Sequence, residues 1–212
     1  MRPFDPRLVG GPALVTAATL AWAAIVSAQM GNTEFLFYVV VMLVLAGLVA
    51  YAHWRVCFSA GVLWALTGWG VLHMAGGLVA VPESWPINGD VRVLYSWWII
   101  PIGDGSGGAG VGQGGWLKYD HLVHAYGFGV SAWACWQGLC AAVGRRLCAT
   151  CGRLMLVGLA AMGLGALNEL VEFVATMLGP SNVGGYVNTG WDLAANGLGV
   201  GVALVVLGVT QR

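Results

Sequence analysis

Six long apolar segments dominate this chain and restrict the folds open to it. Each is close to the roughly 20 residues that a helix needs to cross a bilayer. The segments run over residues 11–30, 35–52, 56–80, 118–142, 154–178 and 189–209. They predict an all-α, polytopic membrane protein, a bundle of six transmembrane helices in a single domain spanning residues 1–212.

Prolines and charge support this interpretation. The seven prolines, at positions 3, 6, 12, 82, 86, 101 and 180, lie at or beyond the segment ends, as intact helices require. Charged residues make up only 8% of the chain, against about 25% in soluble domains, which excludes a soluble enzyme. Nine basic residues balance nine acidic ones, so no nucleic-acid partner is expected.

The positions of the basic residues predict the orientation. Seven of the nine fall on one side of the bundle, which we assign to the cytoplasm together with both termini. Polar residues near the outer ends of the segments would then face the periplasm of a bacterial inner membrane. The five cysteines fall in the cytoplasmic half, where thiols stay reduced. The first segment resembles a signal peptide but is longer than a usual one, so we expect it to remain as a helix.

The longest connection, residues 82–117, lies on the outer side in this arrangement. Its first part is rich in tryptophan, which is typical of the membrane interface. Its second part, residues 103–115, is rich in glycine but lacks the Lys-Ser/Thr ending of a phosphate-binding loop. We expect this part to be a flexible connector.

Polar residues inside the apolar segments are the most informative feature, because charge is costly in a membrane. Helical spacing places Asp120 with His124, and Asp192 with Asn196, on shared faces. The rise of 1.5 Å per residue places all of these residues near the outer ends of their helices. The full set is His73, Asp120, His121, His124, Asn168, Glu169, Glu172, Asp192 and Asn196.

Structural explanations compete for several of these residues. Asp120 could be the N-cap of its helix, and Asp192 could belong to a capping box that begins at Thr189. His121 is expected to face the headgroups, and His73 could be a hydrogen-bonded interior histidine. Glu169 and Glu172 have no such explanation, because two carboxylates one turn apart in hydrocarbon need protons, cations or a metal.

The residue types favour a metal site. Carboxylates and imidazoles are ligands for Zn, Mn or Fe. We predict that Glu169 acts as the catalytic base, and that His121, Asn168 and Asn196 orient the ligands from behind. The predicted metal ligands are His73, Asp120, His124, Glu172 and Asp192.

Several of these motifs occur together in a known family. They are His73-x-x-Gly76, Tyr119-Asp120-x-x-x-His124, Asn168-Glu169-Leu170-x-Glu172 and Gly190-Trp191-Asp192. Over about residues 60–205 the chain resembles the YjdF-like (DUF2238) family of bacterial inner-membrane proteins. It resembles VanZ-like membrane proteins more distantly, through Asp192-x-x-x-Asn196. The resemblance implies six helices and a clustered polar site, and it implies no established reaction.

Three functions remain open at this point. The first is a metal-dependent enzyme that acts on a lipid or lipid-linked substrate at the outer leaflet. The second is a proton- or cation-coupled transporter, since carboxylates inside membranes also serve as relays. The third is an accessory or assembly subunit of a larger membrane complex, or a homo-oligomer, in which the polar cluster only holds helices together.

Overall fold

The computed structural model describes residues 7–102, 114–144, 147–179 and 184–211. Six long helices account for most of these residues, and the long connection between the third and fourth contains one 3-10 turn and two strands. The helices are α1 (Arg7–Met30), α2 (Thr33–Val56), α3 (Ala60–Leu78), α4 (Tyr119–Val143), α5 (Cys151–Leu178) and α6 (Tyr186–Thr210).

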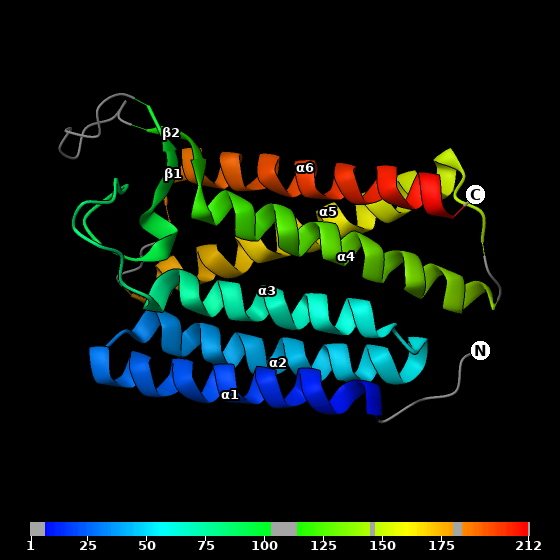
Figure 1. Cartoon of the computed structure of the whole chain (residues 1–212), viewed down its shortest axis with the longest axis horizontal. Helices are drawn as coiled ribbons and strands as arrows, with labels where there is room; N and C mark the ends of the chain where they lie inside the picture. Colours follow the sequence, from blue (N-terminus) through cyan, green and yellow to red (C-terminus); the bar gives the residue numbers. More distant parts are fainter. Residues whose placement is uncertain (1–6, 103–113, 145–146, 180–183, 212) are drawn as a thin grey trace.

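The helices run back and forth along one long axis (Figure 1). Successive helices point in opposite directions, and the start of α1 and the end of α6 lie at the same end of the bundle. The strands lie at the opposite end, which is where α4 and α6 begin. We call this the strand end of the bundle.

The predicted helices are confirmed, with bounds within five residues of those expected. Four of them, α1, α2, α5 and α6, are long and apolar enough to cross a membrane. Helices α3 and α4 are not among these four, and they carry His73, Asp120, His121 and His124.

The outer faces of the apolar helices carry large exposed hydrophobic side chains. On α5, Leu159 is 64% exposed and Phe173 is 59% exposed, and on α6 Val205 is 68% exposed. A soluble protein rarely exposes apolar surface that continues over whole helices. These faces are therefore suited to contact with lipid.

One expectation about proline was wrong. Helix α1 begins at Arg7, four residues before the predicted segment, so Pro12 lies inside the helix rather than at its edge. Backbone hydrogen bonding sets where a helix begins, and α1 begins before the apolar part of the sequence that predicts it. Pro12 has no N–H to donate to the carbonyl of Leu8, so α1 forgoes one backbone hydrogen bond.

Glycines allow the central helices to approach closely. A Cβ added at Gly199 on α6 would lie 1.8 Å from the carbonyl oxygen of Ala125 on α4. A Cβ at Gly129 would lie 3.0 Å from the carbonyl oxygen of Gly199. The backbones of α4 and α6 are therefore in direct contact next to His124, and a larger residue at Gly199 would separate them.

The fold is all-helical as predicted, but the outer connection is not purely loop. It contains a 3-10 turn, Leu94–Ser96, and two antiparallel strands, β1 (Trp98–Pro101) and β2 (Gly115–Lys118). The strand pair leads directly into α4, because β2 ends at the residue before it. The predicted flexible connector, residues 103–115, lies largely outside the described residues, and only its last two residues are described.

Replacing Gly199 by alanine tests this helix contact. Overpacking costs about 1–3 kcal/mol, so we expect Gly199→Ala to lower the unfolding temperature of the detergent-purified protein by about 2–12 °C. Gly201→Ala is the matched control on the same helix, because no atom lies within 4 Å of its added Cβ. Equal unfolding temperatures for the two variants would contradict the contact.

Candidate metal site

Polar side chains from three helices meet around His124 at the strand end of the bundle. Helix α4 supplies Asp120 and His124, α5 supplies Glu169 and Glu172, and α6 supplies Asp192. Positions far apart in sequence converge because α4, α5 and α6 pack on one another. The shared depth predicted from the rise per residue therefore corresponds to a real cluster, which we call the His124 cluster.

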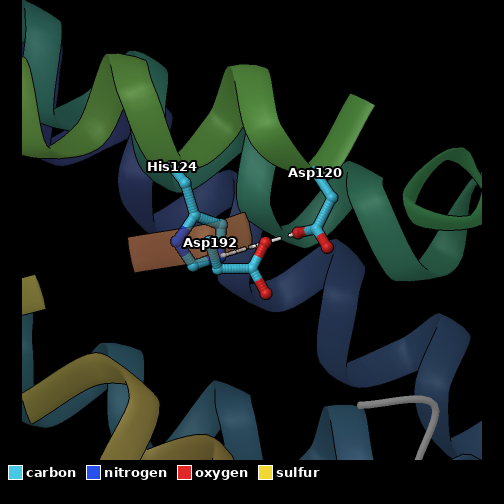
Figure 2. Close-up of side chains that lie close together, drawn as sticks. All are labelled: Asp120, His124 and Asp192. Carbon is cyan, nitrogen blue, oxygen red and sulfur yellow. Dashed lines mark ion pairs between the residues drawn. The ribbon is translucent and has the colours of Figure 1, made fainter. Parts of the chain in front are cut away.

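The two imidazole nitrogens of His124 have different neighbours. His124 Nε2 lies 3.6 Å from Asp120 Oδ1, 3.8 Å from Glu172 Oε1 and 4.0 Å from Asp192 Oδ1. Figure 2 shows the side chains of Asp120, His124 and Asp192 pointing toward one another. Nδ1 instead lies 3.7 Å from Glu169 Oε1. Three carboxylates thus surround one nitrogen, and the fourth lies beside the other.

The carboxylates are buried or half-buried, and they are incompletely hydrogen-bonded. Asp192 is 0% exposed, and the Glu169 side chain is 8% exposed. Asp192 Oδ1 and both carboxylate oxygens of Glu169 lack a hydrogen-bond partner. Leaving a buried carboxylate oxygen without a partner is costly, so the cluster as it stands is electrostatically incomplete.

Amide side chains hold the cluster from behind. Asn196 Oδ1 can only accept, so His124 Nδ1 donates to it over 3.0 Å, which leaves Nε2 with its lone pair. Asn168 Nδ2 donates to Glu172 Oε1 over 2.8 Å. A Cβ at Gly165 on α5 would lie 2.8 Å from Asn196 Nδ2, so this glycine makes room for the amide. Both asparagines singled out in the sequence therefore contact a residue of the cluster.

Lys118 also reaches the cluster, and sequence reasoning missed it. Its side chain is only 7% exposed, and its Nζ donates to Asp120 Oδ2 over 3.0 Å and to Asn188 Oδ1 over 2.7 Å. Asn188 in turn donates to Asp192 Oδ2. The sequence places Lys118 at the outer start of the fourth apolar segment, and its long side chain extends inward from the end of β2 to the cluster. Even so, the cluster contains four carboxylates, and among the described residues the Lys118 ammonium is the lysine or arginine side chain that contacts one of them.

The sequence predicts that His73 is a metal ligand together with His124, but His73 lies outside the His124 cluster. Its Nδ1 lies 2.5 Å from the hydroxyl oxygen of Tyr95, which comes from the outer connection, and its ring stacks on Trp69. Tyr95 is half-buried, and desolvation raises the pKa of its hydroxyl well above the usual range, so it keeps its proton. A Cβ at Gly76 would strike the Tyr95 ring, which shows how closely the outer connection packs on α3.

His121 does not face the headgroups, which corrects the expectation from sequence. It is buried, with Trp191 stacked on its ring, and its Nδ1 accepts a hydrogen bond from the backbone N–H of Lys118. His121 thereby caps the start of α4. His121 lies beside the cluster. It stabilises the start of the helix that carries Asp120 and His124, and it is not placed as a metal ligand.

The two capping explanations for the aspartates are also wrong. The N-cap of α4 is Lys118, so Asp120 lies within the first turn. Helix α6 begins at Tyr186, and Asp192 lies in its second turn, away from the helix start. Neither aspartate is the N-cap of its helix, and the carboxylates of both lie in the His124 cluster.

A cavity of about 220 Å³ opens beside the cluster. Asp120 and Glu172 line it on one side, and His73, Tyr95 and Lys118 also contribute to its wall. Glu169 and Asp192 are not among the residues that line it. A ligand in the cavity would therefore reach the cluster through Asp120 and Glu172.

The spacing within the cluster is suitable for a metal ion. Ligand atoms of one metal bound at about 2.1 Å lie roughly 3–4.2 Å apart, and the three distances from His124 Nε2 fall in this range. Two triads place one ligand atom from each member within 4.8 Å of the others. They are Asp120, His124 and Asp192, and His124, Glu169 and Glu172.

The Tyr95–His73 hydrogen bond generates a test of this arrangement. Tyr95→Phe leaves a buried imidazole nitrogen without its partner, which costs about 1–3 kcal/mol, so we expect a lower unfolding temperature. Tyr126→Phe is the control, because the Tyr126 hydroxyl donates to the carbonyl of Ala65, which lies inside α3 and already accepts a backbone hydrogen bond. If the two variants unfold at the same temperature, the His73–Tyr95 bond does not stabilise the outer connection.

Comparison with known proteins supports the resemblance found in the sequence. The model of one family, described as "Predicted membrane protein (DUF2238)", matches residues 11–212. Searches of curated proteins and of solved structures gave no match. The match extends beyond the residues that carry the resemblance and includes all six helices and the His124 cluster. The chain belongs to the DUF2238 family of membrane proteins.

Proposed function

We propose that this protein binds one divalent metal ion in the His124 cluster, with His124 Nε2, Asp120, Glu172 and Asp192 as ligands. The observation that carries the proposal is that three carboxylates, one buried and two half-buried, each lie within 4.0 Å of one imidazole nitrogen. The buried Asp192 Oδ1, which has no hydrogen bond, supports it independently, because a cation would supply the missing partner.

The donor set favours a particular class of metal. One imidazole and three carboxylates form an oxygen-rich site, which suits Mn²⁺ or Fe²⁺ better than Zn²⁺. His73 would have added a second nitrogen, but Tyr95 occupies its Nδ1. We therefore place Mn²⁺ first and Fe²⁺ second among the predicted metals.

We further propose that all six helices cross a bacterial inner membrane, with the cluster near the periplasmic face. The strand end carries Trp116 and Trp191, which are 72% and 54% exposed, as expected of side chains at a membrane interface. Arg55 and Arg153 lie at the other end, near the end of α2 and the start of α5. That distribution supports a cytoplasmic opposite end.

In this setting the site supports hydrolytic or transfer chemistry on a lipid or lipid-linked substrate. A bound divalent ion would supply a Lewis acid and an activated water. Asp120 and Glu172 line the cavity, so the ligand set opens toward the space where a substrate would enter. Glu169 lies beside Nδ1 and away from the cavity, so we now propose that it positions His124 instead of acting as the base.

The accessory-subunit and transporter alternatives are less well supported. A cluster that only joined helices would have its carboxylates satisfied by protein groups, whereas Glu169 and Asp192 keep oxygens without hydrogen bonds. A cavity also adjoins the cluster. A transporter needs a route onward, and the described cavity is lined by residues of the strand end, such as Glu34, His73 and Asn188.

Metal binding by Glu172 provides the direct test. We expect the detergent-purified, chelator-treated protein to bind one Mn²⁺ per chain in a titration followed by electron paramagnetic resonance. Glu172→Gln should weaken this binding by about 100-fold, since even outer partners of a metal ligand contribute about 10–100-fold. Glu83→Gln is the control, because Glu83 is exposed in the outer connection. Unchanged Mn²⁺ affinity in Glu172→Gln would exclude this ligand set.

The support from Asn196 can be tested without altering a ligand. Gly165→Ala would press on Asn196 and turn His124, so we expect about 10-fold weaker Mn²⁺ binding. Gly163→Ala changes the same helix at a position where no atom lies within 4 Å of the new Cβ, and it should bind like the unmodified protein. The idea fails if Gly165→Ala binds Mn²⁺ as tightly as Gly163→Ala.

A further inference from the structure

The cavity beside the cluster is small, polar and placed at the ends of the helices. Its volume of about 220 Å³ lies below the roughly 300–1,000 Å³ of pockets for drug-sized ligands. Lys118 and Asp120 lie at the start of α4, and Glu34 lies in the first turn of α2. In a membrane protein such positions lie near the lipid headgroups, so the cavity is suited to one headgroup and not to a whole lipid.

Lys118 gives the cavity a buried hydrogen-bond donor. Its ammonium has three protons, and the described contacts to Asp120 and Asn188 use two of them. The side chain is 7% exposed, yet it lines the cavity. The third proton is therefore available to a ligand in a place where water is scarce and an ionic hydrogen bond is strong.

His73 adds a second donor to the cavity wall. The Tyr95 hydroxyl can donate to Nδ1, and in that tautomer the neutral imidazole carries its own proton on Nε2. Nδ1 is thereby occupied, and Nε2 is the nitrogen left for other partners. His73 lines the same cavity as Lys118.

The metal-binding side of the cavity completes the recognition. Asp120 and Glu172 line the cavity, so a metal held by them would border it and keep a coordination position toward it. A ligand that contacts both this metal and the donors on Lys118 and His73 must offer several acceptor oxygens. A tetrahedral oxyanion has this property, because its oxygens can bind a cation on one side and donors on the other.

We propose that the cavity binds the phosphate group of a lipid headgroup, with one oxygen on the metal and others on Lys118 and His73. This inference rests on the proposed metal site. Glu34 also lines the cavity and would repel the anion, which favours a phosphodiester with one negative charge over free phosphate with nearly two.

Phosphorus NMR on the Mn²⁺-loaded protein tests the proposal. Mn²⁺ is paramagnetic, so a phosphate bound to it relaxes much faster than one in solution. We expect dihexanoylphosphatidylglycerol to show this fast relaxation, and the Mg²⁺-loaded protein to show none. If Mn²⁺ binds but the phosphorus signals of both this lipid and inorganic phosphate relax normally, the phosphate inference fails while the metal proposal stands. If Mn²⁺ does not bind, both fail.

A comparison of two phosphate probes distinguishes the possible sources. We expect the short-chain lipid to bind at least about threefold more tightly than inorganic phosphate, because Glu34 opposes the second negative charge. Tighter binding of inorganic phosphate would overturn the lipid assignment. Dihexanoylglycerol, which lacks phosphate, should not compete with the lipid probe, and competition by it would show that the acyl chains alone are recognised.

Two variants separate the role of charge from that of folding. Lys118→Gln, assayed at saturating Mn²⁺, should weaken phosphate-lipid binding about tenfold, because one ionic hydrogen bond is lost. Glu34→Gln should strengthen the binding of inorganic phosphate, and it does not alter the proposed metal ligands. If Lys118→Gln does not fold, the Glu34→Gln result decides. Unchanged or weaker phosphate binding in Glu34→Gln would contradict the proposed placement of the anion.

Discussion

The cost of holding four buried or half-buried carboxylates around one histidine is the constraint on which the rest of this structure depends. Asp120, Glu169, Glu172 and Asp192 contact His124, and Lys118 is the described cation that reaches them. Carboxylates in such surroundings need compensation from protons, cations or a metal. The asparagines and Lys118 supply part of it, and a divalent ion would supply the remainder.

Close helix packing makes this cluster possible. Gly199 brings α6 against the backbone of α4, and Gly165 makes room on α5 for Asn196. These contacts fix the distance between His124 and the carboxylates on the other helices. The outer connection completes the arrangement, since β2 ends at Lys118 and the 3-10 turn delivers Tyr95 to His73. The glycines and the strands therefore serve one purpose, which is to position the side chains at the strand end of the bundle.

Much of this arrangement could be predicted from residue spacing. Apolar length identified six helices, and the rise per residue placed Asp120, His124, Glu172 and Asp192 near the same depth. Depth alone could not separate His73 from this group, because its partner Tyr95 comes from a loop with no regular spacing. Lys118 was missed for a related reason. Its backbone lies at the N-cap of α4, and its long side chain reaches several ångströms from there to the carboxylate of Asp120. The strands escaped prediction because each is only four residues long.

The position of a bound metal is the measurement that tests this account most directly. Crystals of the Mn²⁺-loaded protein, measured at the manganese absorption edge, would give an anomalous difference map. The account predicts one peak at about 2.0–2.2 Å from His124 Nε2 and from oxygens of Asp120, Glu172 and Asp192. A map with no peak in the cluster, or with the peak bound elsewhere, would contradict it.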